Sequence, residues 1–121
     1  MEANNMAEKW LDVVKDNLEK RDEVQISLRG RYDKKNGYLV LSKKKALFVA
    51  EQGFLSKTTS LSFNDPYTKI TAGELSGRHL KLVNSDGTAH TIEMGGAHNA
   101  KKRLDDLMKQ STPKSKKSRS G

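Results

Sequence analysis

The chain has 121 residues, enough for one domain with a modest core, and it has no cysteine, which excludes disulfides and thiolate metal sites. No run approaches the ~18 apolar residues of a membrane-spanning helix, and the N-terminal sequence MEANNMAEKW lacks the layout of a signal peptide. The net charge is +8, but half of this excess lies in residues 111–121. We therefore expect a cytoplasmic protein, and the charge alone does not indicate a nucleic-acid ligand.

The first predicted element is an amphipathic helix over residues 6–20. Apolar side chains recur there at helical spacing, while charged residues fill the other side. The apolar positions are Ala7, Trp10, Leu11, Val14 and Leu18. We expect residues 1–22 to form an N-terminal helix that packs on the domain, with a partner-binding helix as the alternative.

Residues 23–110 are predicted to form the domain itself, with about seven short strands followed by a helix. The first strand shows alternation at Val24, Ile26 and Leu28. Residues 33–37 end it, because the Asn36-Gly37 pair is a strong turn signal. Further strands are expected at residues 38–42, 45–51, 58–63, 68–75, 78–84 and 88–94.

After the strands, Gly95-Gly96 breaks the pattern, and a second helical stripe spans residues 97–110. The fold class is therefore α+β, in which a curled antiparallel sheet needs the C-terminal helix to close its open end. Residues 111–121 have too few apolar side chains to form a packed structure, so we expect a disordered basic tail or linker.

The order of these elements resembles the pleckstrin-homology-like (PH-like) superfold, in particular prokaryotic PH and GRAM-type domains. The matching pattern is Gly37, an apolar strand, Ser42, a basic turn and a second apolar strand that contains Phe48. The resemblance implies a seven-stranded, partly open barrel with a capping helix, to which the N-terminal helix is an addition. More remotely, the chain resembles the ubiquitin-binding GLUE domains of ESCRT-II. Fold alone does not choose among lipid binders and protein binders.

No catalytic constellation is visible in the sequence. The three histidines, His79, His90 and His98, lack the HxxxH or HExxH spacing that places two ligands on one face of a helix. We interpret them as solvated or packing side chains. Gly95-Gly96 before a helix could present amides to an anion, but a strand-to-helix break explains the pair equally well. We expect neither an enzyme nor a bound metal or cofactor.

Basic residues gather at two connections of the predicted sheet, and in PH domains, which the chain resembles, such residues bind headgroup phosphates. The candidate residues for binding anionic lipid are Arg29, Arg31, Lys34 and Lys35 at the first connection and Lys43, Lys44 and Lys45 at the second. Successive connections lie at opposite ends of an antiparallel sheet, so the two groups cannot grip one headgroup together. A solvated turn remains an equal explanation for the second group.

The leading hypothesis is thus an adaptor module that associates peripherally with an anionic membrane surface, at its inner face. The tail would add electrostatic attraction through Lys114, Lys116, Lys117 and Arg119. The alternative is a protein-interaction module that binds ubiquitin or a peptide within a larger complex. For nucleic acid we expect only non-specific contact, because no exposed aromatic pair is evident for base stacking.

Overall fold

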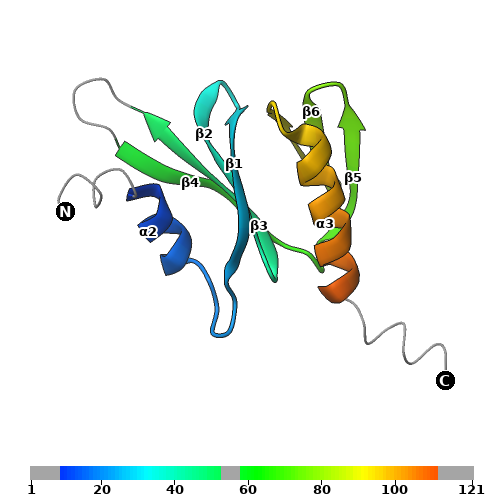
Figure 1. Cartoon of the computed structure of the whole chain (residues 1–121), viewed down its shortest axis with the longest axis horizontal. Coiled ribbons are helices and arrows are strands. Elements are labelled where there is room, and N and C mark those ends of the chain that lie inside the picture. Colours follow the sequence, from blue (N-terminus) through cyan, green and yellow to red (C-terminus); the bar gives the residue numbers. More distant parts are fainter. Residues whose placement is uncertain (1–8, 53–57, 112–121) are drawn as a thin grey trace.

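The computed structural model of the chain describes residues 9–52 and 58–111, which form two helices and seven strands (Figure 1). The elements are α2 (Lys9–Asp16), β1 (Val24–Tyr32), β2 (Lys35–Ser42), β3 (Lys45–Gln52), β4 (Thr58–Pro66), β5 (Ile70–Ser76), β6 (His79–Asn84), β7 (Ala89–Glu93) and α3 (Ala97–Ser111). Neither helix of this described part is long and apolar enough to cross a membrane.

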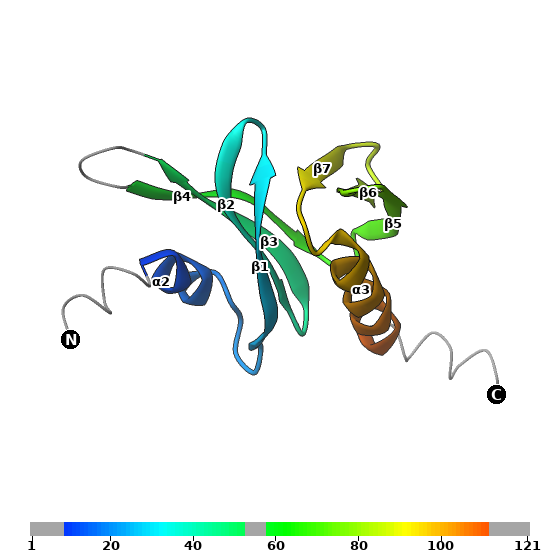
Figure 2. The same ribbon diagram turned by 45° about the horizontal axis from the view of Figure 1, so that its top comes forward.

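The strands form one antiparallel sheet in the order β4-β3-β2-β1-β7-β6-β5. β4 and β5 are its two edges, so the sheet curls without closing. Its halves, β1–β4 and β5–β7, meet where Arg31 of β1 lies opposite Glu93 of β7. Figures 1 and 2 show α3 against the β5–β7 half and α2 against the β1–β4 half. The predicted α+β fold, a curled and partly open sheet with a C-terminal helix and an added N-terminal helix, is confirmed.

The main core lies between the sheet and α3, where side chains such as Phe48 and Leu104 are fully buried. Strands β2 and β3 are also buried at successive positions, since every residue of 39–41 and 46–50 is 0% exposed. Successive side chains of a strand point to opposite faces. Both faces of β2 and β3 are therefore covered.

Helix α2 covers the outer face of β2, β3 and β4, where it builds a second apolar group. We call this group the outer cluster: Val14, Val40, Leu47 and Val49. The ring of Trp10 stacks on Tyr38 beside the cluster, with centroids 4.2 Å apart. Within the described residues, which do not include Ala7, the apolar side of α2 lies on the sheet. The helix ends at Asp16, before residue 20, and the Asn17 side chain donates to the carbonyl of Val13 at 2.8 Å.

The predicted turn at Asn36-Gly37 is wrong, because the chain reverses at Asp33-Lys34. Asp33 and Lys34 have φ values of 54° and 65°, the left-handed conformation that a two-residue hairpin loop of type I′ requires at both positions. Asn36 and Gly37 instead belong to β2. A turn at Asn36-Gly37 would shift the register so that the first half of β1 no longer faced β2. The observed register pairs β1 with β2 over nearly their whole length.

Candidate functional site

A polar cleft of about 370 Å³ opens on the outer face where β1 meets β7. Its polar side chains come from β1, β2, the β5–β6 turn and β7, and Gly30, Met94 and Gly95 complete its lining. We call it the arginine cleft. Its polar residues are the three arginines Arg29, Arg31 and Arg78, together with Asn36 and Glu93.

The alternation of β1 places two of these arginines in the cleft. Ile26, Leu28 and Tyr32 point into the main core, so Arg29 and Arg31 project from the other face and are exposed. Gly30 lies between them, and a Cβ at this position would approach Ile92 Cγ2 to 2.9 Å. The close approach of β1 to β7 therefore brings the arginines up to the end of β7.

Arg78 is the basic residue of the cleft that the sequence did not predict. It lies in the turn between β5 and β6, after Gly77, whose φ is 59°. The carbonyl of Arg78 accepts a hydrogen bond from the Met94 amide at 2.8 Å. This bond holds the turn against the end of β7, and the Arg78 guanidinium lies about 4.0 Å from the position that a Cβ on Gly95 would occupy.

The cleft carries an excess of positive charge. Arg29 donates to the Tyr38 hydroxyl at 3.0 Å, and its guanidinium carbon lies 5.2 Å from the centroid of that ring. Within residues 9–52 and 58–111, neither Arg31 nor Arg78 forms an ion pair. Helix α3 begins just after Gly95 without an acidic residue in its first turn, so the positive end of its dipole adds to the same field.

Lys34 and Lys35 flank the arginine cleft without lining it. Lys34 is exposed in the β1–β2 turn, and Lys35 is half-buried in the first position of β2. The second predicted group, Lys43 to Lys45, lies at the opposite end of β2, as expected for successive connections. Thus the structure brings Arg29 and Arg31 together with Arg78 and keeps them apart from Lys43 to Lys45.

Acidic residues of the segment that follows α2 contact the lysines of the β2–β3 turn. Lys43 lies 3.5 Å from Glu23, and Lys44 lies 3.9 Å from Glu19. The Asp22 carboxylate accepts hydrogen bonds from the Ser42 hydroxyl at 2.9 Å and from the Lys44 amide at 3.1 Å. The β2–β3 turn thus binds the acidic segment of its own chain. These contacts occupy its lysines and make it a weaker candidate for binding an external anion.

Lys45 differs from its neighbours because it is only 7% exposed. Its ammonium group donates to the carbonyl of Asn17 at 2.8 Å and lies 4.0 Å from Glu19. A buried ammonium that is held in this way cannot reach a membrane headgroup. Lys45 holds the segment after α2 against the sheet, and this role is structural.

The substitution Lys45→Met should destabilise the fold, because it leaves the Asn17 carbonyl without its donor. We expect a loss of about 1–2 kcal/mol in the free energy of unfolding by urea. The control Lys44→Met removes an exposed ion pair and should change this value by no more than about 0.5 kcal/mol. Equal effects of the two substitutions would contradict the structural role of Lys45.

The remaining candidates, Lys114, Lys116, Lys117 and Arg119, lie outside the residues that the structure describes, as does the predicted disorder of the tail.

A partly buried polar chain also links β1, β7 and β4. The Tyr32 hydroxyl lies 2.6 Å from His90 Nδ1, and His90 Nε2 lies 3.1 Å from a carboxylate oxygen of Asp65. The imidazole stacks on Phe63 with centroids 4.2 Å apart. Burial, and then the charges of Asp33 and Asp65, raise the pKa of the Tyr32 phenol. His90 is thus a packing histidine, and no group of three His, Cys, Asp or Glu residues in the described ranges could hold a metal ion.

Comparison with known proteins supports the fold. No family model and no curated protein matches the chain. The C-terminal domain of an unknown protein from Leishmania infantum superposes with a TM-score of 0.60 at 13% identity, over 88% of this chain and 97% of that chain. A DUF1696 family protein with a pleckstrin-homology domain from Shewanella loihica gives 0.56 at 16% identity, over 84% and 92%. These similarities show that the fold is PH-like.

Proposed function

We propose that the protein is a non-enzymatic binding module whose arginine cleft holds the phosphate of an anionic phospholipid headgroup. The observation that carries this proposal is the convergence of Arg29, Arg31 and Arg78 on one open cleft that a single carboxylate, Glu93, also lines. Guanidinium groups present planar pairs of N–H donors that match phosphate oxygens. The resemblance to prokaryotic PH and GRAM-type domains supports a lipid ligand.

The placement of the arginine cleft suits a membrane surface. In Figure 1 the β1–β2 hairpin, the β5–β6 turn and the start of α3 lie at the same end of the molecule. Lys34 lies in the turn of that hairpin, and Lys35 is the first residue of β2. Each basic side chain near an anionic bilayer contributes up to ~1 kcal/mol, which salt reduces. The lysines would thus orient this end toward the membrane while the arginines hold one headgroup.

Removal of one arginine from the cleft should weaken membrane binding. We expect Arg31→Gln and Arg78→Gln each to lower the affinity for anionic liposomes by roughly fivefold, since one charge contributes about 1 kcal/mol. Co-sedimentation with phosphatidylserine-containing liposomes at low and high salt measures this effect. The control Lys109→Gln changes the charge equally at the other end of α3 and should leave binding nearly unchanged.

Two outcomes would contradict the proposal. Equal recovery of the protein with anionic and with neutral liposomes would show that charge does not drive association. Equal losses in all three variants would show that net charge acts without the arginine cleft.

A second candidate function is protein recognition, and the observation that favours it is the edge of the sheet at β5. Leu75 of this strand is a large apolar side chain that is 37% exposed. A groove of about 570 Å³ runs between β5 and α3, with Ala72 and Met108 among its lining residues. An exposed edge strand can accept an extended peptide, and the remote GLUE resemblance suggests ubiquitin. Salt-resistant amide shifts along β5, measured by NMR with added ubiquitin, would distinguish this function from lipid binding.

A further inference from the structure

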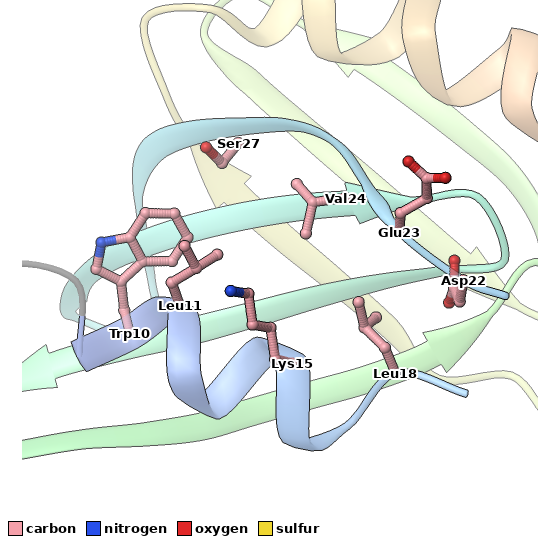
Figure 3. Close-up of a pocket in the computed structure, with 8 residues that line it drawn as sticks. All are labelled: Trp10, Leu11, Lys15, Leu18, Asp22, Glu23, Val24 and Ser27. Carbon is pink, nitrogen blue, oxygen red and sulfur yellow. The ribbon is translucent and has the colours of Figure 1, made fainter. Parts of the chain in front are cut away.

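A second cavity, of about 450 Å³, lies between α2 and the outer face of β1. We call it the α2–β1 groove. Four apolar side chains, from Trp10, Leu11, Leu18 and Val24, form most of its walls, and Ser27 lies on the β1 side. In Figure 3 the side chains of Leu11 and Lys15 extend from α2, and that of Leu18 from the segment after the helix, on the side that faces β1. Its volume is in the range of small-molecule sites.

The groove exists because α2 covers the sheet unevenly. The helix packs mainly against β3 and β4, while the outward position of β1 nearest the groove is occupied by the short side chain of Ser27. Leu11 and Leu18 therefore remain half-buried, with an apolar side that no described residue fully covers. Lys15 also lines the groove and is exposed. A lysine at such a position can lay its aliphatic stem along apolar surface while its ammonium group stays in water.

The α2–β1 groove and the arginine cleft lie next to each other along β1, since Ser27 lines the groove and Arg29 lines the cleft. Trp10 lines the groove and stacks on Tyr38, and the Tyr38 hydroxyl accepts the hydrogen bond from Arg29, which lines the cleft. Along β1, the outward side chains of Ser27, Arg29 and Arg31 follow each other at about 6.6 Å, two residues of strand rise apart. An apolar surface and a cationic surface are thus neighbours on one face of one strand.

We propose that the groove and the cleft together bind a single-chain anionic amphiphile, with its phosphate among the arginines and its alkyl chain against α2. This inference rests on the proposed anion binding in the cleft and adds the apolar part of the ligand. Charge sets the direction of the ligand, because the arginines lie on one side of the groove, whereas the carboxylates Asp22 and Glu23 line its end near Val24 and already contact the β2–β3 turn. From Arg29 back to Val24 the strand spans about 17 Å, a length of the order of an extended dodecyl chain.

Titration of the whole protein with dodecyl phosphate and with glycerol phosphate tests this inference, with both ligands kept below micelle-forming concentrations. We expect dodecyl phosphate to bind at least tenfold more tightly. NMR should show shifts of the Leu11, Leu18 and Val24 methyl groups with dodecyl phosphate only. The fluorescence of Trp10, the sole tryptophan of the chain, should change with it.

A substitution that fills the groove gives the matched comparison. Ser27→Phe should abolish the extra affinity for dodecyl phosphate and leave glycerol phosphate binding intact. The control Ser60→Phe places the same side chain at an exposed position of β4 and should change neither affinity. Leu11→Gln is a second variant that makes the wall polar without filling the groove, and it should also remove most of the gain.

The outcomes separate this inference from the proposed function. If glycerol phosphate binds and dodecyl phosphate binds no more tightly, the groove has no role and the anion site stands. If neither ligand binds, the proposed function fails and this inference fails with it. If dodecyl maltoside, which has a neutral head, binds as tightly as dodecyl phosphate, the arginines do not select the head and the combined site is wrong.

Discussion

Replacing Gly37 with alanine is expected to destabilise the sheet by roughly 3 kcal/mol or more, at or beyond the upper end of the usual cost of overpacking. A Cβ at this position would lie 2.1 Å from the carbonyl oxygen of Val49 and 2.8 Å from the Ala50 Cα. Both are backbone atoms of β3, the strand paired with β2. No side-chain rotation can relieve such contacts, so the two strands must move apart.

The free energy of unfolding by urea measures this effect, with Gly95→Ala as the control for Gly37→Ala. The built Cβ of Gly95 has only the end of the Arg78 side chain near it, at 4.0 Å, so alanine there should be tolerated. A cost below about 1 kcal/mol for Gly37→Ala would show that β2 and β3 can separate locally.

Gly37 also shows why the sequence misplaced the first hairpin turn. Asn-Gly pairs favour two-residue turns, and this local signal predicted a reversal at Asn36-Gly37. The glycine is needed instead because β3 passes close to it, a contact between segments that local sequence does not reveal. Asp33 and Lys34 adopt positive φ although neither is glycine, because the paired length of β1 and β2 outweighs the local cost. Strand and helix patterns, by contrast, predicted the order of the elements.

The candidate site was predictable only in part. Arg29 and Arg31 alternate along β1, and their position on the outer face follows from strand periodicity. Arg78 is a single arginine in a turn that is distant in sequence. It reaches the same cleft only because β1 and β7 are adjacent strands in the sheet. Lys45 was predicted to bind an anion together with Lys43 and Lys44. Its burial depends on the docking of α2, for which the acidic residues after the helix were the available signal.

The substitution Val14→Asp should have the other large effect, because it places a carboxylate in the centre of the outer cluster. Val14 is 0% exposed and packs against Val40, Leu47 and Val49. A buried charge without a partner typically costs about 3–5 kcal/mol, so α2 should leave the sheet or the domain should unfold. Thermal unfolding and the emission maximum of Trp10 measure this, since release of α2 also breaks the stacking on Tyr38.

The control Lys9→Asp adds a carboxylate at an exposed position at the start of the same helix and should leave both readings close to those of the parent protein. Release of α2 uncovers the apolar outer face of β2 and β3, so Val14→Asp should also self-associate in gel filtration. It should lose the tight binding of dodecyl phosphate because Trp10 and Leu11 leave the groove, whereas Arg31 and Arg78 remain on the sheet. Retention of Trp10 emission and monomeric behaviour in Val14→Asp would show that α2 does not cover the sheet, and the groove built on that packing would then not exist.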